Sequence, residues 1–160
     1  MQLTKLLVVA LVGVGGAFGA FAAELKVTDI SKPGKLTSLK AGTIRSTPYK
    51  VSKFPEELKG LPCVFVPRGS GGKPGMKFSF TVNEPVTVYI FVHARGGYVP
   101  EGWTKTDLKA QWLVAKNVYK DDVYKKDFPA GKVEIPEHTG TQQKNKPPYG
   151  VAHLAVIKAK

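Results

Sequence analysis

The stretch "FSFTVNEPVTVYIFVHAR", residues 78–95, contains two strand patterns joined by a three-residue turn. In the first pattern apolar and polar side chains alternate, which predicts a strand with one buried face. The second, residues 86–93, is apolar on both faces, because Tyr89 and Phe91 occupy positions where polar residues are expected. Either this strand is central and covered on both faces, or the two rings form an exposed platform. The tight "NEP" connection predicts a β-hairpin.

Outside this stretch, short β-like runs alternate with glycine and proline, and no run after the N-terminal segment keeps helical periodicity for three turns. The segment "FPEELKG" is long enough for one turn of helix, and the pair Asp121-Asp122 is typical of a turn between strands. The pattern predicts an all-β protein: an antiparallel β-sandwich, jelly-roll or Ig-like, with about eight to nine strands. The runs are 25–30, 49–54, 63–66, 76–82, 86–93, 111–119, 122–128, 132–135 and 151–158.

The N-terminal residues have the features of a secretory signal peptide. Lys5 precedes the apolar run 6–14, and Ala20-Phe21-Ala22 supplies the small residues of a cleavage site. We therefore expect a signal peptide at 1–22 and a single domain at 23–160, secreted or periplasmic, with no transmembrane segment after cleavage. An uncleaved membrane anchor is the open alternative.

Positive charge dominates the composition. The chain has 24 basic and 12 acidic residues, a net charge of +12, and loss of Lys5 with the leader leaves +11. Apart from Arg45, Arg68 and Arg95, every basic residue is a lysine. Lysine is a hydrated point charge, so a lysine-rich surface favours diffuse attraction to anionic polymers over specific reading of nucleic acid. Simple solubility is the alternative explanation. The sequence indicates no oligomeric state.

Motifs for catalysis or metal binding are missing from the sequence. The three histidines are far apart, and no metal-ligand spacing occurs. Ser70 lies in "PRGSGG", which is not the nucleophile elbow of a serine hydrolase. Cys63 lies in the apolar run "LPCVFV" and is expected to be a buried, unreactive thiol. We therefore predict no catalytic residue, no metal and no cofactor.

Aromatic and basic residues gather just after the strand at 86–93. A tryptophan beside a guanidinium suits stacking on a sugar ring. Trp103 has a second interpretation, in which it only closes the end of the sandwich, and Trp112 alternates like a core residue. The candidate ligand-binding residues are Arg95, Tyr98, Trp103 and Lys105.

The order of motifs resembles a known module. The segments "YKVSKFPEELKG", "FSFTVNEPVTVYIFVHAR", "PEGW" and "VYKKDFPAG" are similar to a non-catalytic β-sandwich accessory module of exported bacterial proteins, of the kind found beside carbohydrate-active enzymes and sulfatases. The resemblance covers residues 36–158. Arg95 matches the arginine that closes the long strand of that module, and Trp103 matches the tryptophan of the next loop. The residues matching its "FPAG" turn are Phe128, Pro129 and Gly131.

Two departures from that module concern its site. His93-Ala94 stands where members carry an acidic pair, and the polar loop 139–150 replaces a short glycine turn.

We expect a secreted, non-catalytic, carbohydrate-binding type of module whose partner is a polysaccharide or another anionic cell-surface polymer. A structural or interaction protein of the cell envelope or extracellular matrix is the alternative, and a carbohydrate hydrolase or esterase is the third.

Overall fold

The computed structural model describes residues 24–42, 45–46, 49–66, 75–94, 98–138 and 153–160. The predicted signal peptide at 1–22, the candidate Arg95 and the loop at 139–150 lie outside them. Within the described ranges, no helix has the length and apolar character needed to cross a membrane.

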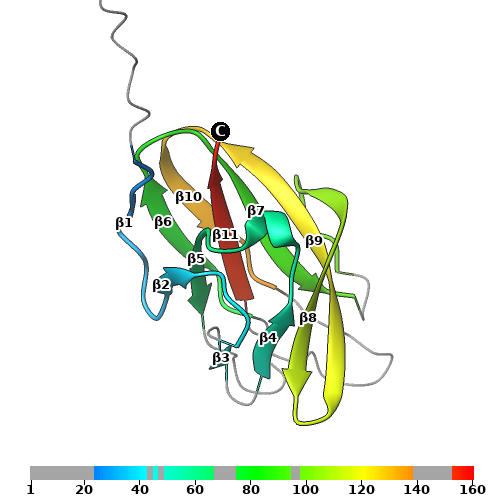
Figure 1. The fold of residues 1–160 in the computed structure, drawn as a ribbon. Helices are drawn as coiled ribbons and strands as arrows, with labels where there is room; N and C mark the ends of the chain where they lie inside the picture. The colour runs from blue at the N-terminus through cyan, green and yellow to red at the C-terminus, as the bar shows by residue number, and fades with distance from the viewer. Residues whose placement is uncertain (1–23, 43–44, 47–48, 67–74, 95–97, 139–152) are drawn as a thin grey trace, which may run out of the picture.

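Two antiparallel sheets make up the fold (Figure 1). The smaller has the order β1-β6-β10, with bounds Val27–Thr28, Phe78–Val82 and Gly131–Ile135. The larger has the order β2-β5-β11-β7-β9-β8-β4-β3. Its strands are β2 (Lys35–Ser38), β3 (Arg45–Ser46), β4 (Tyr49–Lys53), β5 (Pro62–Val66), β7 (Val86–His93), β8 (Thr104–Val114), β9 (Asn117–Phe128) and β11 (His153–Ala159).

This architecture confirms the predicted all-β antiparallel sandwich, with more strands than expected because the short strands β2 and β3 lie outside the predicted runs. The predicted single turn of helix is also present, as the 3-10 helix η1 at Glu56–Leu58.

A first core fills the space between the two sheets. Phe78, Phe80 and Val82 of β6 face it, as their alternation predicts, together with the even-numbered residues of β7 from Val86 to Val92. Met76, which the same alternation placed on this face, precedes β6 and is exposed. The first core therefore contains one face of β7.

A second core lies on the opposite side of the large sheet. Tyr89 and Phe91 of β7 are buried in it, and η1 contributes Leu58. The segment that contains η1 covers this core. Two backbone hydrogen bonds hold it in place, from Leu39 N to Leu61 O (2.9 Å) and from Gly60 N to Leu39 O (2.9 Å). Figure 1 shows this segment crossing over the middle of the large sheet. Strand β7 is thus covered on both faces, which is why both of its faces are apolar.

The "NEP" connection is not the hairpin that we predicted. β6 pairs with β1 and β10, whereas β7 pairs with β9 and β11 in the other sheet. The connection is therefore a corner between the sheets. The Asn83 side chain stabilises it by accepting a hydrogen bond from Lys26 N (2.7 Å) and donating one to Glu24 O (3.0 Å).

The prediction of a turn at Asp121-Asp122 is also wrong. Both residues lie inside β9, and the hairpin turns at Ala115-Lys116, with Ala115 at a φ of 51°. The Asp121 carboxylate is buried and accepts a 2.7 Å hydrogen bond from the Trp112 indole N–H. This hydrogen bond gives the buried Asp121 carboxylate a partner inside the strand. The composition of the Asp-Asp pair alone favours a turn instead.

Candidate functional site

The aromatic rings of the predicted loop site point inward. Trp103 is 8% exposed, belongs to the first core, and packs against Phe128 with ring centroids 5.9 Å apart. Gly102, just before it, has a φ of +72°, a conformation that suits glycine. A buried indole cannot stack on a ligand unless the loop opens, so this position matches the end-closing interpretation of Trp103.

Tyr98 is half-buried and holds two parts of the same end of the molecule together. Its hydroxyl donates a 2.7 Å hydrogen bond to Glu137 O, and its ring contacts His138 edge-on at 5.1 Å between centroids. Burial and the nearby Glu137 carboxylate raise the Tyr98 pKa. The residue acts as a neutral structural donor in this position.

Lys105 instead points to solvent and joins an ion-pair cluster. Its Nζ lies 2.7 Å from Asp122 Oδ2, and Lys109 Nζ lies 2.5 Å from Asp122 Oδ1. Partial burial opposes ionisation of Asp122, but the hydrogen bonds from the two lysines outweigh it and lower the pKa of this carboxyl. Both lysine side chains stay more than half exposed.

More lysines share this face of the large sheet. In the register, Lys50 of β4 lies opposite Leu113 of β8, which lies opposite Val118 of β9. In the next row Gln111 of β8 lies between two lysines. It pairs with Lys53 of β4 on one side and with Lys120 of β9 on the other. Directly opposed residues of antiparallel strands share a face. We call this surface of β4, β8 and β9 the lysine face; its lysines are Lys50, Lys53, Lys105, Lys109 and Lys120.

A β-bulge places Lys53 on that face. Val51 pairs with Trp112 and points into the second core, and the register shifts before Lys53 pairs with Gln111. The extra residue, Ser52, donates from Oγ to Gln111 O at 3.2 Å. Because the bulge reverses the alternation, Phe54 packs on the second core and Lys53 faces outward.

The three histidines, isolated in the sequence, meet at one end of the sandwich. The rings of Phe78, His153, His138 and Tyr98 form a row of contacts, which we call the histidine end. The His138 and His153 centroids are 5.4 Å apart, and His93 N donates to His138 Nε2 at 3.4 Å.

Both histidines of the row are held neutral by burial. Burial lowers the pKa of His138 to about 3 and that of His153 to about 4. His138 Nδ1 and both ring nitrogens of His153 have no partner in hydrogen-bonding geometry among the described residues, although the nearby Met76 backbone opposes part of the His153 shift. The described side chains include no group of three or more His, Cys, Asp or Glu arranged to hold a metal ion.

A second polar contact lies beside the histidine end. His93 Nδ1 is 3.4 Å from Asp121 Oδ1 and 3.0 Å from Lys120 O. Burial raises the Asp121 pKa, while hydrogen bonds from His93 and Trp112 oppose the shift. A His–Asp contact is one part of a nucleophile-activating arrangement, but Ser70 lies outside the described residues and Cys63 is buried, with its pKa raised by that burial.

The fold is similar to part of a solved enzyme structure. The structure resembles part of a solved β-glucuronidase of glycoside hydrolase family 2, with a TM-score of 0.60 and 14% identity over 82% of this chain. The match spans 14% of the length of that enzyme. At this identity the likeness concerns the fold alone, a β-sandwich that also occurs within a carbohydrate enzyme. No protein-family model matches the sequence, and the curated proteins include no match to it.

Proposed function

We propose that this chain is a secreted, non-catalytic binding module for a polysaccharide or another anionic polymer of a cell surface. The observation that carries the proposal is the exposed lysine excess, since the chain has a net charge of +12 and lysines line one face of its large sheet. Such a surface attracts polyanions over long distances and concentrates them near the protein.

The fold likeness supports the carbohydrate side of the proposal. A sandwich similar to part of a β-glucuronidase is a scaffold known to occur with carbohydrate chemistry, while catalysis is a property of individual sites and does not follow from a fold. We keep Arg95, Tyr98 and Lys105 as proposed contacts. We assign Trp103 to holding the loop against Phe128.

The alternative is a structural or interaction protein of the envelope or matrix. The inward packing of Trp103 and Tyr98 favours it, because these side chains then stabilise the end of the sandwich without touching a ligand. A carbohydrate hydrolase or esterase is the third candidate, and the His93–Asp121 contact is the feature that would serve it.

Retention on polysaccharide columns at two salt concentrations tests the proposal. We expect the protein to be retained on immobilised hyaluronan and heparin, to pass through uncharged dextran, and to elute as salt rises, because exposed charges are screened by salt. Failure to bind either acidic polymer would favour the structural alternative. Retention that salt leaves unchanged would indicate stacking and return the aromatic residues to the site.

A further inference from the structure

We propose that the lysine face is the docking surface for an acidic polysaccharide whose carboxylates are widely spaced along the chain, such as one uronate in each disaccharide. This inference rests on the proposed function and assigns it a surface and a ligand class. It extends the site from the loop at 95–105, through Lys105, to the exposed residues of β4, β8 and β9.

The charges of the face argue for an anionic occupant. Two carboxylates belong to this surface: Asp122, which pairs with Lys105 and Lys109, and Asp107, which is exposed in the irregular part of β8 between those two lysines. Lys50, Lys53 and Lys120 are exposed, and no ion pair joins them to a described carboxylate. Positive charge therefore remains along β4 and β9 after the internal pairs are satisfied.

The spacing of the charges argues for a sparse polyanion. Neighbouring strands lie about 4.8 Å apart, so the backbones of Lys53 and Lys120, separated by Gln111, are about 10 Å apart. Duplex DNA carries one charge per about 1.7 Å, and a single strand one per about 3.4 Å. A polymer with one carboxylate per disaccharide offers far fewer charges along its length, which suits the spacing of the lysines.

The side chains between the lysines suit sugars better than bases. Gln111 offers an amide donor and acceptor to hydroxyl groups, and Val118, half exposed beside Leu113, offers an apolar contact for the C–H face of a ring. Base stacking needs an exposed aromatic side chain, and Trp112 and Tyr119 of these strands pack on the opposite side, toward the second core. We therefore choose a polysaccharide over a nucleic acid.

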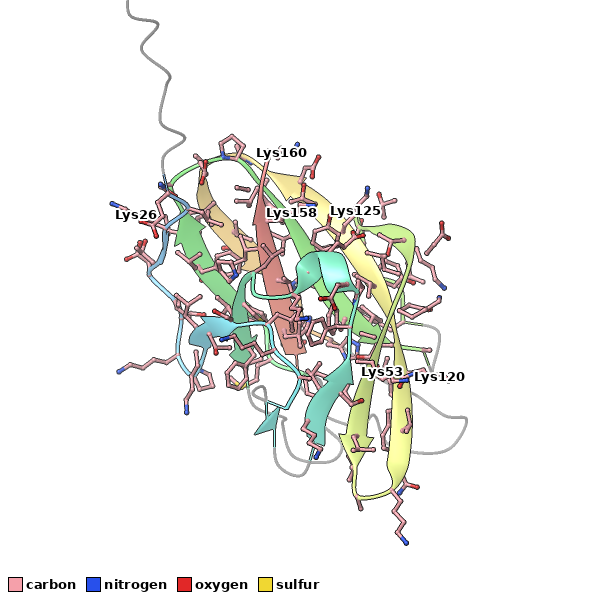
Figure 2. The ribbon with its side chains drawn as sticks, in the orientation of Figure 1. Lys26, Lys53, Lys120, Lys125, Lys158 and Lys160 are labelled. Carbon is pink, nitrogen blue, oxygen red and sulfur yellow. The ribbon has the colours of Figure 1, made fainter. Side chains whose placement is uncertain are left out.

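Two charge-matched triple variants test the surface. The first, Lys50→Gln with Lys53→Gln and Lys120→Gln, removes exposed charge from the lysine face. The second, Lys26→Gln with Lys77→Gln and Lys158→Gln, removes equal charge from exposed positions elsewhere. Figure 2 shows Lys53 near the arrowhead of β4 and Lys120 on the β8–β9 hairpin, both in the lower half of the view, whereas Lys26 and Lys158 lie in its upper half.

Affinity for hyaluronan, measured at low and physiological salt, gives the decisive comparison. We expect the lysine-face variant to bind at least about tenfold more weakly and with a shallower salt dependence, and the control variant to stay within about twofold of the unmodified protein. Thermal unfolding checks that both variants fold. If a triple variant does not fold, Lys120→Gln and Lys158→Gln serve as the matched single pair.

The possible failures are distinguishable. Equal weakening by both triple variants would overturn the lysine face as the site while the proposed function stands. Stronger dependence of single-stranded DNA binding on the lysine face, compared with hyaluronan binding, would overturn the choice of occupant. An unmodified protein that binds neither hyaluronan nor heparin would overturn the proposed function, and this inference with it.

Discussion

The lysine face and the histidine end both gather basic side chains, but in opposite surroundings. Lys105 and Lys109 lie on an open sheet with their side chains more than half exposed. His138 and His153 are 1% and 0% exposed and contact each other between the two sheets. Water solvates the lysine charges at little cost, whereas the core penalises charge on the histidines.

This difference separates what each region does for the protein. The lysine face carries exposed charge and can act on a distant polyanion, but its contribution to stability is small. The histidine end is neutral and contributes by packing, so that any condition that charges it weakens the fold. Binding is therefore expected to respond to salt, and stability is expected to respond to acid.

The largest expected effect is destabilisation by acid. The folded-state pKa values of His138 and His153, about 3 and about 4, lie below the ordinary value of 6.5. The unfolded chain therefore binds more protons as pH falls below 6.5. The contribution of the two neutral histidines to the free energy of unfolding is complete above about pH 6.5. It is lost as pH falls toward 4, at about 1.4 kcal/mol per pH unit for each histidine. Asp121 acts in the opposite sense, because burial raises its pKa.

Denaturant unfolding at a series of pH values between 7 and 4 measures this loss. The matched variant is His153→Leu, which removes a buried ring whose two nitrogens lack partners among the described residues. We expect it to have the smaller pH slope and to be no less stable than the unmodified protein at pH 7, since a lost unsatisfied polar group offsets the change in shape. An unchanged slope would contradict the assignment of acid sensitivity to the histidine end.

A smaller effect is expected for Tyr98→Phe at the same end. The change keeps the ring contact with His138 and removes the hydrogen bond to Glu137 O, so the free energy of unfolding should fall by about 0.5–1.5 kcal/mol. Urea unfolding measures it, with Val99→Ala, at a side chain that is 65% exposed in the same loop, as the control. A Tyr98→Phe variant as stable as the control would show that the hydroxyl does not hold this end together.

The smallest effect is expected for Lys109→Gln on the lysine face. Asp122 keeps its contact with Lys105, and exposed ion pairs contribute little, so the melting temperature should not change measurably at low or high salt. Thermal melts at both salt concentrations check this. A loss of stability as large as that of Tyr98→Phe would mean that the two regions differ less than their exposure suggests.

Much of the fold could be predicted from the sequence, because apolar alternation and turn residues are local signals. The strands 86–93 and 132–135 and the one-turn helix were predicted close to their observed bounds. The burial of Cys63 and Trp112 was also predicted and is confirmed. The hairpin errors arose where tertiary contacts override local preference, at the Asn83 corner and at the buried Asp121 carboxylate.

The candidate site was less predictable for a physical reason. Loop residues were chosen by composition, but whether Trp103 points outward depends on the space beside Phe128, which no local pattern describes. Lys53 reaches the lysine face because a bulge reverses its alternation. The signal that could have been followed is the polar alternation at Lys109, Gln111, Lys120 and Asp122, which marks an uncovered strand face.

By itself the sequence determined an all-β chain with a strong positive charge and an unusual strand that is apolar on both faces. These properties follow from composition and from the two-residue period of a strand, so they require no knowledge of neighbours. The tertiary structure decided which strands meet. It covered β7 with the segment that contains η1, brought His138 to His153, and aligned lysines from β4, β8 and β9. Such contacts depend on sheet order and register, which residues far apart in the chain set together.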